Sequence, residues 1–288
     1  MNQRPIDFSY AIDHTHWVGD GFRVNNYFPS GKDLLKRFSP FIMMDYAAPF
    51  EFAPSHKPRG VGAHPHRGFE TVSLAFEGAV EHHDNKGNHG IIYPGDVQWM
   101  TAGSGLLHRE YIEKEFNQTG GRMHFVQLWV NLPKQHKMTS PKYQSITKAE
   151  MGHYVDYGIT ASVLAGELKG IQGPASTFTP MNIYTLSLDK AATIKLEEPK
   201  HHHVGMLVLA GELKIQGQSY HAKDFILFKE EAGSIQLDAI TEAKLLVLSG
   251  EPIDEPIVAY GPFVMNTMEE IQQAHQDYHA GKFGPFEF

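Results

Sequence analysis

The stretch TVSLAFEG at residues 71–78 is the clearest indicator of this chain's fold class. Its first six residues include β-branched and aromatic types that favour strands, and Glu77-Gly78 ends the run as a turn. Two more turn signals follow at short intervals, DNKGN at residues 84–88 and YPGD at residues 93–96. Short strands separated by turns at this spacing predict an antiparallel sandwich or barrel, whose interior could hold a site.

Two short strings flank this region, HPH at residues 64–66 and HRE at residues 108–110. Alternate side chains of a strand point to the same face, so His64 pairs with His66 and His108 with Glu110. If the two strands lie together inside a barrel, three imidazoles and one carboxylate converge. Each string alone is a weak signal, because the chain contains 18 histidines. In a predicted barrel, the two strings together indicate an open metal site.

Composition limits the class of protein. A length of 288 residues, with 20% charged and 11% aromatic residues, indicates a globular protein of one large or two medium domains. The formal net charge of −8 argues against general affinity for nucleic acid or anionic membranes. No cysteine is present, so a bound metal must take nitrogen and oxygen ligands. The first residues resemble no signal peptide and no apolar stretch is long enough to span a bilayer, so we expect a cytoplasmic protein.

The pattern divides into two halves, which we expect to be domains at residues 1–135 and 136–288. A strand-like run at residues 124–130 leads into a polar stretch that is typical of a linker. In the second half, HHH at residues 201–203 precedes MLVLAGE at residues 206–212, which weakly repeats the first half and suggests duplicated β modules. No His-x-Glu pair follows, so the second half lacks a complete metal site. We expect His201 to His203 to form an exposed polar turn and this half to be structural or regulatory.

The tail changes from strand to helix periodicity. Asn266 or Thr267 can cap a helix whose first turn carries Glu269 and Glu270, and Gly281 can end it. The residues expected on its apolar face, at helical spacing, are Met268, Ile271, Ala274 and Tyr278. The pattern predicts a C-terminal helix that packs against a barrel.

The chain resembles the pirin family, which are bicupin proteins of the cupin superfamily. The resemblance covers nearly the whole chain, and its central strings are highly specific. It rests on VGDGF at residues 18–22, PFIMMD at 40–45, GVGAHPHRGFET at 60–71, PGDVQWMTAG at 94–103, QLWVNL at 127–132 and GPFVMNT at 261–267.

The resemblance implies an all-β fold of two cupin β-barrels (double-stranded β-helix, or jelly-roll, domains) followed by the C-terminal helix. Only the N-terminal barrel would bind metal. The family's ligands fall on His64, His66, His108 and Glu110, the set that strand parity also selects. One divalent ion is implied, most often Fe(II), with Mn, Ni, Co, Cu and Zn as alternatives; no other cofactor is expected.

Two classes of function follow from this resemblance. Some members are described as quercetin 2,3-dioxygenases, which open a flavonol with O2 and release carbon monoxide. In such an enzyme Glu110 would be either a ligand alone or also the catalytic base, since at the metal it would lie within reach of the flavonol 3-hydroxyl. Others are described as regulators that bind a protein partner and respond to the oxidation state of iron. A structural zinc site is a third alternative. Neither direct nucleic-acid binding nor membrane binding is expected.

The sequence departs from the family at two positions. Arg109 lies between the two ligands of its string, where relatives have a small residue, and strand parity points it away from the metal. Ser104 stands where many relatives have Arg, which removes a positive charge near the loop before His108.

Other residues near these strings have weaker assignments. Glu70 shares parity with His64 and His66 and is a reserve ligand, although an outer-shell role is the stronger expectation. Asp45, Phe125 and Gln127 are expected to line the pocket or to be ordinary core residues. A last group is expected to lie away from the metal: Tyr111 on the outer face, and His82, His83 and His89 in or beside a solvated hairpin loop.

Overall fold

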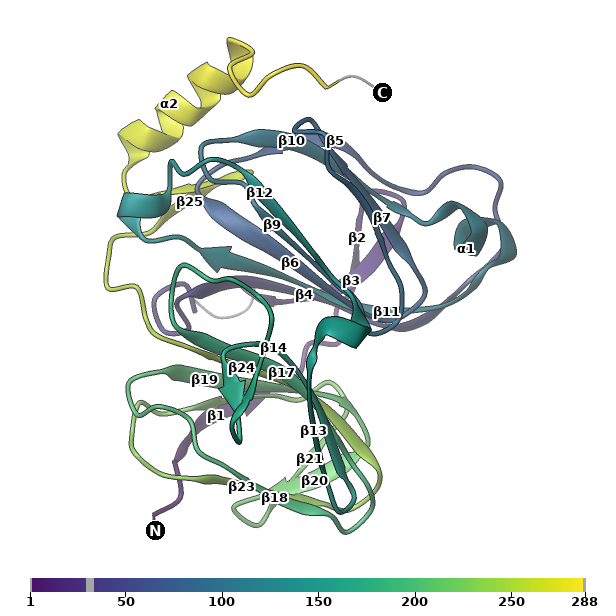
Figure 1. The fold of residues 1–288 in the computed structure, drawn as a ribbon, viewed down its shortest axis with the longest axis vertical. Coiled ribbons are helices and arrows are strands. Elements are labelled where there is room, and N and C mark those ends of the chain that lie inside the picture. Colours follow the sequence, from purple (N-terminus) through teal and green to yellow (C-terminus); the bar gives the residue numbers. More distant parts are fainter. Residues whose placement is uncertain (1, 30–33, 287–288) are drawn as a thin grey trace. The chain divides into compact units, whose positions relative to one another are not determined.

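The computed structural model describes residues 2–29 and 34–286. Its contacts divide the chain into two compact units (Figure 1). One unit, here called the histidine barrel, comprises residues 14–36, 40–148 and 253–288. The other, here called the second barrel, comprises residues 1–13, 37–39 and 149–252. Strands dominate both units, and the described residues contain two α-helices, so the predicted all-β class is confirmed.

The histidine barrel is built from two antiparallel sheets (Figure 1). The larger sheet has, in spatial order, β12 (Lys142–Ile146), β9 (Val97–Thr101), β6 (Phe69–Glu77), β11 (Gly121–Asn131), β4 (Phe41–Phe52), β3 (Phe22–Phe28) and β2 (His16–Val18). The smaller sheet has β5 (Gly60–His66), β10 (Leu106–Ile112), β7 (Val80–Asp84) and β8 (His89–Ile92). The stretch at residues 71–78 forms most of β6, in the middle of the larger sheet.

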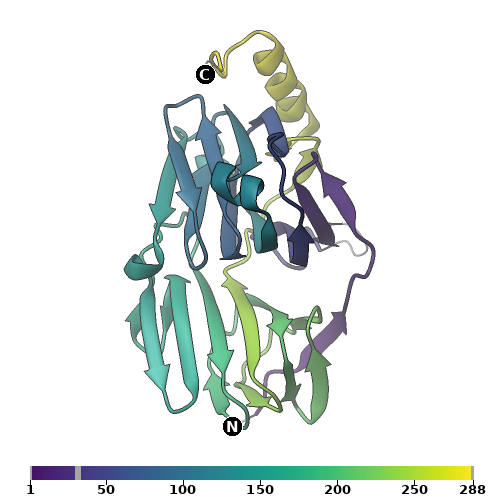
Figure 2. The same ribbon diagram turned by 90° about the vertical axis from the view of Figure 1, so that its right-hand side faces the viewer.

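The second barrel repeats this plan (Figure 2). Its larger sheet has the order β1 (Ile6–Tyr10), β22 (Phe225–Phe228), β19 (His203–Ala210), β24 (Ala243–Gly250), β17 (Met181–Leu188), β14 (Ile159–Ala165) and β13 (Gly152–Asp156). Its smaller sheet has β18 (Thr193–Leu196), β23 (Ile235–Ala239), β20 (Glu212–Ile215) and β21 (Gln218–His221). The same sheet sizes in both units confirm the predicted pair of cupin barrels.

The shorter elements connect or decorate these sheets. They are the hairpins β15 (Glu167–Leu168) with β16 (Ile171–Gln172) and β25 (Val258–Tyr260) with β26 (Phe263–Met265), the 3-10 turns η1 (Lys134–His136) and η2 (Lys148–Glu150), and the helices α1 (Lys114–Thr119) and α2 (Met268–His279). None of the helices in the described part of the chain is both long and apolar enough to cross a membrane.

The predicted C-terminal helix is present as α2. Thr267 is its N-cap and forms a capping box with Glu270, which satisfies two backbone N–H groups that a helix start leaves free. Ile271 and Ala274 are buried as predicted, whereas Met268 is 48% exposed. The helix belongs to the histidine barrel, where Asp277 pairs with Arg67 at 2.8 Å.

The observed division of the chain therefore differs from the expected domains at residues 1–135 and 136–288. β12 follows the expected boundary yet pairs with β9 in the histidine barrel. The expected linker also contains Lys137, which is buried and donates hydrogen bonds to three oxygens of that barrel. At the other end, β1 pairs with β22 in the second barrel. These pairings are long-range, so the local pattern does not reveal them.

The expected exposed turn at residues 201–203 is wrong for two of its three histidines. His202 and His203 are buried, and His203 bridges the Ser39 carbonyl and the Glu230 carboxylate, both at 2.7 Å. His202 Nδ1 lies 3.0 Å from Ser249 Oγ. Their side chains serve packing and hydrogen bonding in the second barrel.

Candidate metal centre

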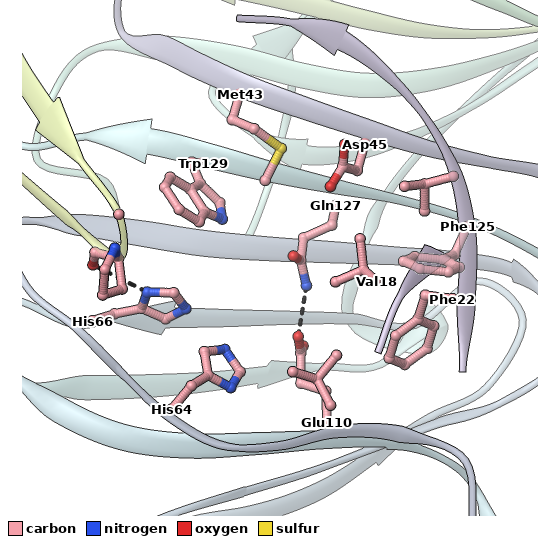
Figure 3. Close-up of a pocket in the computed structure, with 14 residues that line it drawn as sticks. Val18, Phe22, Met43, Asp45, His64, His66, Glu110, Phe125, Gln127 and Trp129 are labelled. Atoms are coloured by element: carbon pink, nitrogen blue, oxygen red, sulfur yellow. Dashed lines mark hydrogen bonds between the residues drawn. The ribbon is translucent and has the colours of Figure 1, made fainter. Parts of the chain in front are cut away.

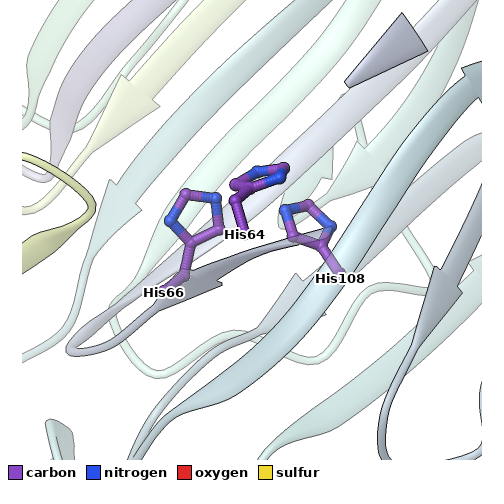
Figure 4. A group of neighbouring side chains, drawn as sticks. All are labelled: His64, His66 and His108. Carbon is purple, nitrogen blue, oxygen red and sulfur yellow. The ribbon is translucent and has the colours of Figure 1, made fainter. Parts of the chain in front are cut away.

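Strands β5 and β10 bring three histidines together on the inner face of the smaller sheet. The strands are antiparallel, with His108 opposite His64 and Leu106 opposite His66. The centroid of the His64 ring lies 4.8 Å from that of His66 and 4.3 Å from that of His108. The ring centroids of His66 and His108 lie 4.9 Å apart. Figure 4 shows the three rings turned toward a common point. One ligand nitrogen from each ring lies within 4.8 Å of the others, so the three residues form a group that could hold one ion.

The hydrogen bonds of the rings indicate which nitrogen each one offers. His64 Nδ1 lies 2.8 Å from the Gly62 carbonyl and His66 Nδ1 lies 3.2 Å from the Pro262 carbonyl. A carbonyl only accepts, so each Nδ1 carries the proton and each Nε2 keeps its lone pair. His108 Nε2 is buried and has no hydrogen-bond partner. If the proton of His108 also lies on Nδ1, which is 3.3 Å from His82 Nδ1, the three Nε2 atoms form a donor set that suits a metal ion.

Burial favours the neutral, ligating form of the His66 and His108 rings. Desolvation lowers the pKa of His66 well below the ordinary imidazole value, and the nearby His64 lowers it further. Desolvation likewise lowers the pKa of His108, with His64, His66 and His82 contributing. Three protonated rings this close would repel one another, whereas neutral rings need no protons removed before they bind a cation.

Glu110 lies two residues beyond His108 on β10, but a register shift separates them. His108 is opposite His64 on β5, whereas Glu110 is opposite Val61. The Nε2 atoms of Gln98 and Gln127 each donate to one oxygen of the Glu110 carboxylate, at 2.7 Å. Figure 3 shows Gln127 reaching across the cavity to Glu110. The two amides fix the orientation of the carboxylate.

The described residues form two ligand groups on the inner face, and His108 belongs to both. One group is His64, His66 and His108, and the other is His82, His108 and Glu110. Glu110 therefore lies next to His108, on the side toward β7. His64, His66 and Glu110 also line one cavity.

His82 is the residue near the candidate site whose expected position is wrong. It was expected in a solvated loop, but its side chain is fully buried on the inner face of β7 and stacks on Tyr143, with centroids 4.9 Å apart. Its Nδ1 lies 3.3 Å from His108 Nδ1, and its Nε2 lies 3.4 Å from Asp84 Oδ2. Strand parity could have indicated this position, because a strand that ends at Asp84 places the side chains of His82 and Asp84 on the same face.

Asp84 is itself firmly held. Its Oδ1 accepts hydrogen bonds from the backbone of Lys86 and Asn88, and the Asn88 amide reaches both oxygens. Burial raises the pKa of Asp84, but the hydrogen bonds from His82, Asn88 and Lys86 outweigh that effect and leave the pKa below its usual value. The Asp84 carboxylate next to His82 Nε2 is therefore ionised.

The cavity in front of the histidines has a volume of about 270 Å³, near the small end of ligand sites. Its wall is mainly apolar, and the predicted lining residues Asp45, Phe125 and Gln127 are confirmed (Figure 3). Burial raises the pKa of Asp45, whose Oδ1 accepts a hydrogen bond from Asn26. The other lining residues are Val18, Phe22, Val24, Met43, Val61, His64, His66, Glu110, Trp129, Gly261 and Pro262.

The remaining candidates lie away from this cavity. Glu70 is buried on β6, where Thr101 Oγ1 donates to it at 2.7 Å, and it belongs to neither ligand group. Tyr111 shares the outer face of β10 with Arg109, whose guanidinium lies 5.5 Å from its ring. A positive charge is still present near Ser104, because Arg67 Nε donates to the Ser104 carbonyl at 2.8 Å.

Two cupin barrels, one of them with converging histidines at an apolar cavity, define a bicupin metal protein. The sequence model of pirin matches residues 21–130, and that of the pirin C-terminal cupin domain matches residues 183–284. The chain belongs to the pirin family.

Relatives extend this comparison over the full length. A candidate quercetin 2,3-dioxygenase of Pseudomonas aeruginosa is 45% identical over 95% of this chain and 96% of its own length. Pirin of Mus musculus is 36% identical over 92% of this chain and 89% of its own. A crystal structure of quercetin 2,3-dioxygenase from Acinetobacter baumannii is 43% identical, with a TM-score of 0.94 over 99% of this chain and 100% of that one.

Proposed function

We propose that this protein is a metal-dependent dioxygenase that opens a flavonol such as quercetin with O2 and releases carbon monoxide. The observation that carries the proposal is the grouping of His64, His66 and His108, two of which (His64 and His66) line an apolar cavity together with Glu110. Similarity to proteins named as quercetin 2,3-dioxygenases supports this assignment over nearly the whole chain. A cytoplasmic location is part of the same proposal.

The proposed ligands are His64, His66, His108 and Glu110, with Fe(II) as the ion. The donor set fits a divalent transition metal, because it offers three neutral imidazole nitrogens and one carboxylate. The buried Nε2 of His108, which has no hydrogen-bond partner, is the strongest sign that a cation belongs here. When bound, the ion supplies Lewis acidity and redox chemistry toward O2.

The chain's own residues would bind the substrate and move one proton. Phe22, Phe125 and Trp129 line the cavity and can pack against the flat rings of a flavonol while excluding water. Glu110 would take the proton of the 3-hydroxyl on one carboxylate oxygen. Gln98 and Gln127 would hold that carboxylate in place, through the hydrogen bonds they already make.

The alternative is a regulator that binds a protein partner according to the state of its metal. Carbon monoxide release distinguishes the enzyme from the regulator, since a protein that only binds a partner would release none. The cavity favours the enzyme, because sensing metal charge alone does not require an apolar chamber of about 270 Å³.

The test is anaerobic reconstitution with Fe(II), followed by quercetin and O2. We expect loss of flavonol absorbance together with carbon monoxide release, both absent in His108→Ala. His153→Ala, which changes an exposed histidine of β13, is the matched control and should keep full activity. Stoichiometric iron without turnover would reject the flavonol reaction and favour the regulator.

A further inference from the structure

Strand β7 carries side chains of types that can bind a metal on its outer face, apart from the inner centre. His82 and Asp84 point into the barrel, so the alternation of the strand sends Glu81 and His83 outward. On the neighbouring strand β8, His89 lies directly opposite His83 in the antiparallel register. Directly opposite residues are the closest neighbours on a sheet face, so three potential ligands share one patch.

The distances show that these side chains already gather. His89 Nε2 lies 3.0 Å from Glu81 Oε1, and His83 Nδ1 lies 3.7 Å from the same oxygen. The two imidazole rings stack at 4.0 Å with an interplanar angle of 18°. One ligand atom from each residue lies within 4.8 Å of the others. The stacked rings would have to tilt apart for both lone pairs to reach one ion.

Partial burial and the positive charge of Arg109 favour the neutral form of His83. On the other side of β7, Arg109 of β10 is the register partner of His83. Partial burial lowers the pKa of His83, and the nearby His89 and Arg109 lower it further, although Glu81 opposes them. A neutral imidazole can ligate, but the positive charge of Arg109 also repels a cation and limits its affinity.

We propose that Glu81, His83 and His89 form a second divalent-cation site, on the outer face of the histidine barrel. Two imidazoles and one carboxylate suit Zn²⁺ or a similar borderline transition metal, with solvent in the remaining positions. The site is separate from the inner centre, because its ligands lie on the opposite face of the sheet. It does not depend on the proposed dioxygenase activity.

The experiment is calorimetric titration of the metal-free full-length protein with Zn²⁺. We expect two equivalents to bind, the second in the micromolar range. His89→Ala and Glu81→Gln should each weaken one equivalent at least tenfold and leave the other intact. His108→Ala should instead lose the inner equivalent and keep the outer one, so failure of either site is seen separately.

Two controls keep the result interpretable. His153→Ala should retain both equivalents, and unfolding curves should show that each variant is folded. The imidazole signals of His83 and His89 in NMR spectra of the wild type should shift with the second equivalent. A single equivalent in the wild type, a second one only at millimolar Zn²⁺, or one unaffected by His89→Ala and Glu81→Gln would overturn the proposal.

Discussion

The Nδ1 atoms of His82 and His108 lie 3.3 Å apart inside the histidine barrel. Two ring nitrogens at this distance interact favourably only if one donates and the other accepts. Asp84 accepts from His82 Nε2, so His82 Nδ1 holds a lone pair and His108 Nδ1 carries the proton. This order leaves the lone pair of His108 on Nε2, which is buried and has no hydrogen-bond partner. The chain of Asp84, His82 and His108 therefore sets the tautomer of a proposed ligand.

Replacing His82 should weaken metal binding without changing the proposed ligands. His82→Ala removes the acceptor for His108 Nδ1, and Asp84→Asn removes the charge behind it. We expect affinity for Fe(II) or Co(II) to fall about 10- to 100-fold in each variant, the usual cost of losing an outer-shell partner. Competition with a chromophoric chelator measures the change.

Tyr143→Phe is the control for the His82 variants. It keeps the ring that stacks on His82 and removes a buried hydroxyl that has no hydrogen-bond partner. Its metal affinity should match the wild type. If His82→Ala also matches the wild type, His82 does not orient His108.

Gln127→Leu should impair turnover more than metal binding. The substitution removes the amide that donates to Glu110 Oε2 at 2.7 Å, so only the hydrogen bond from Gln98 still holds the carboxylate. We expect kcat for quercetin to fall about 10- to 100-fold, as for loss of one positioned polar group. Iron content should remain stoichiometric. Equal kcat in the variant and the wild type would show that the orientation of Glu110 by Gln127 does not contribute to turnover.

The buried carboxyl of Glu70 should make stability depend on pH. Burial raises its pKa from 4.5 to about 7. The folded state therefore binds more protons than the unfolded state between these values, and the stabilising contribution of this group falls as pH rises through that window. Relative to Glu70→Gln, the wild type should lose up to about 3 kcal/mol between pH 4.5 and pH 8.

Urea unfolding of both proteins at several pH values measures this difference. Glu242→Gln, which changes an exposed carboxylate, should follow the wild type at every pH. Parallel pH profiles for Glu70→Gln and the wild type would show that Glu70 titrates normally in the fold.

Asp277→Ala should remove the ion pair that attaches helix α2 to Arg67. Arg67 is buried, and besides Asp277 it contacts the Ser104 carbonyl and the Phe283 ring, whose centroid lies 4.7 Å from its guanidinium. Removing Asp277 leaves a buried charge without its partner, which costs about 3–5 kcal/mol. Denaturant unfolding should show this loss, whereas Gln272→Ala on the exposed side should change the unfolding free energy by under ~0.5 kcal/mol. An equal effect of both variants would contradict the anchoring role.

The histidines of the candidate site could be predicted because strand periodicity is a local property. The spacing of two residues between His64 and His66 is enough to place their side chains on the same face of a strand. Their position beside His108 follows from the pairing of β5 with β10. The position of Glu110 was harder, because the register shift between it and His108 depends on β5. His82 was missed because the turn signal that begins at Asp84 outweighed the strand before it.

Local sequence patterns cannot predict which segments of the chain belong to each barrel. β1 pairs with β22, more than two hundred residues away, and β12 joins a sheet whose other strands come earlier in the chain. Helix α2 was predictable in its bounds and cap, since capping signals are local. Its attachment through Asp277 to Arg67 was not, because the sequence carries no mark of a contact across two hundred residues.

Strand β7 alternates two sets of side chains residue by residue, with the proposed outer ligands Glu81 and His83 on one face and His82 and Asp84, which orient the proposed ligand His108, on the other. Single substitutions on the outer face can add or remove a cation site during evolution without disturbing the inner histidines. An insertion or deletion of one residue is different, because it would exchange the two faces and destroy both sets together. The lineage of this protein can therefore vary the composition of β7 on its outer face, but not its length.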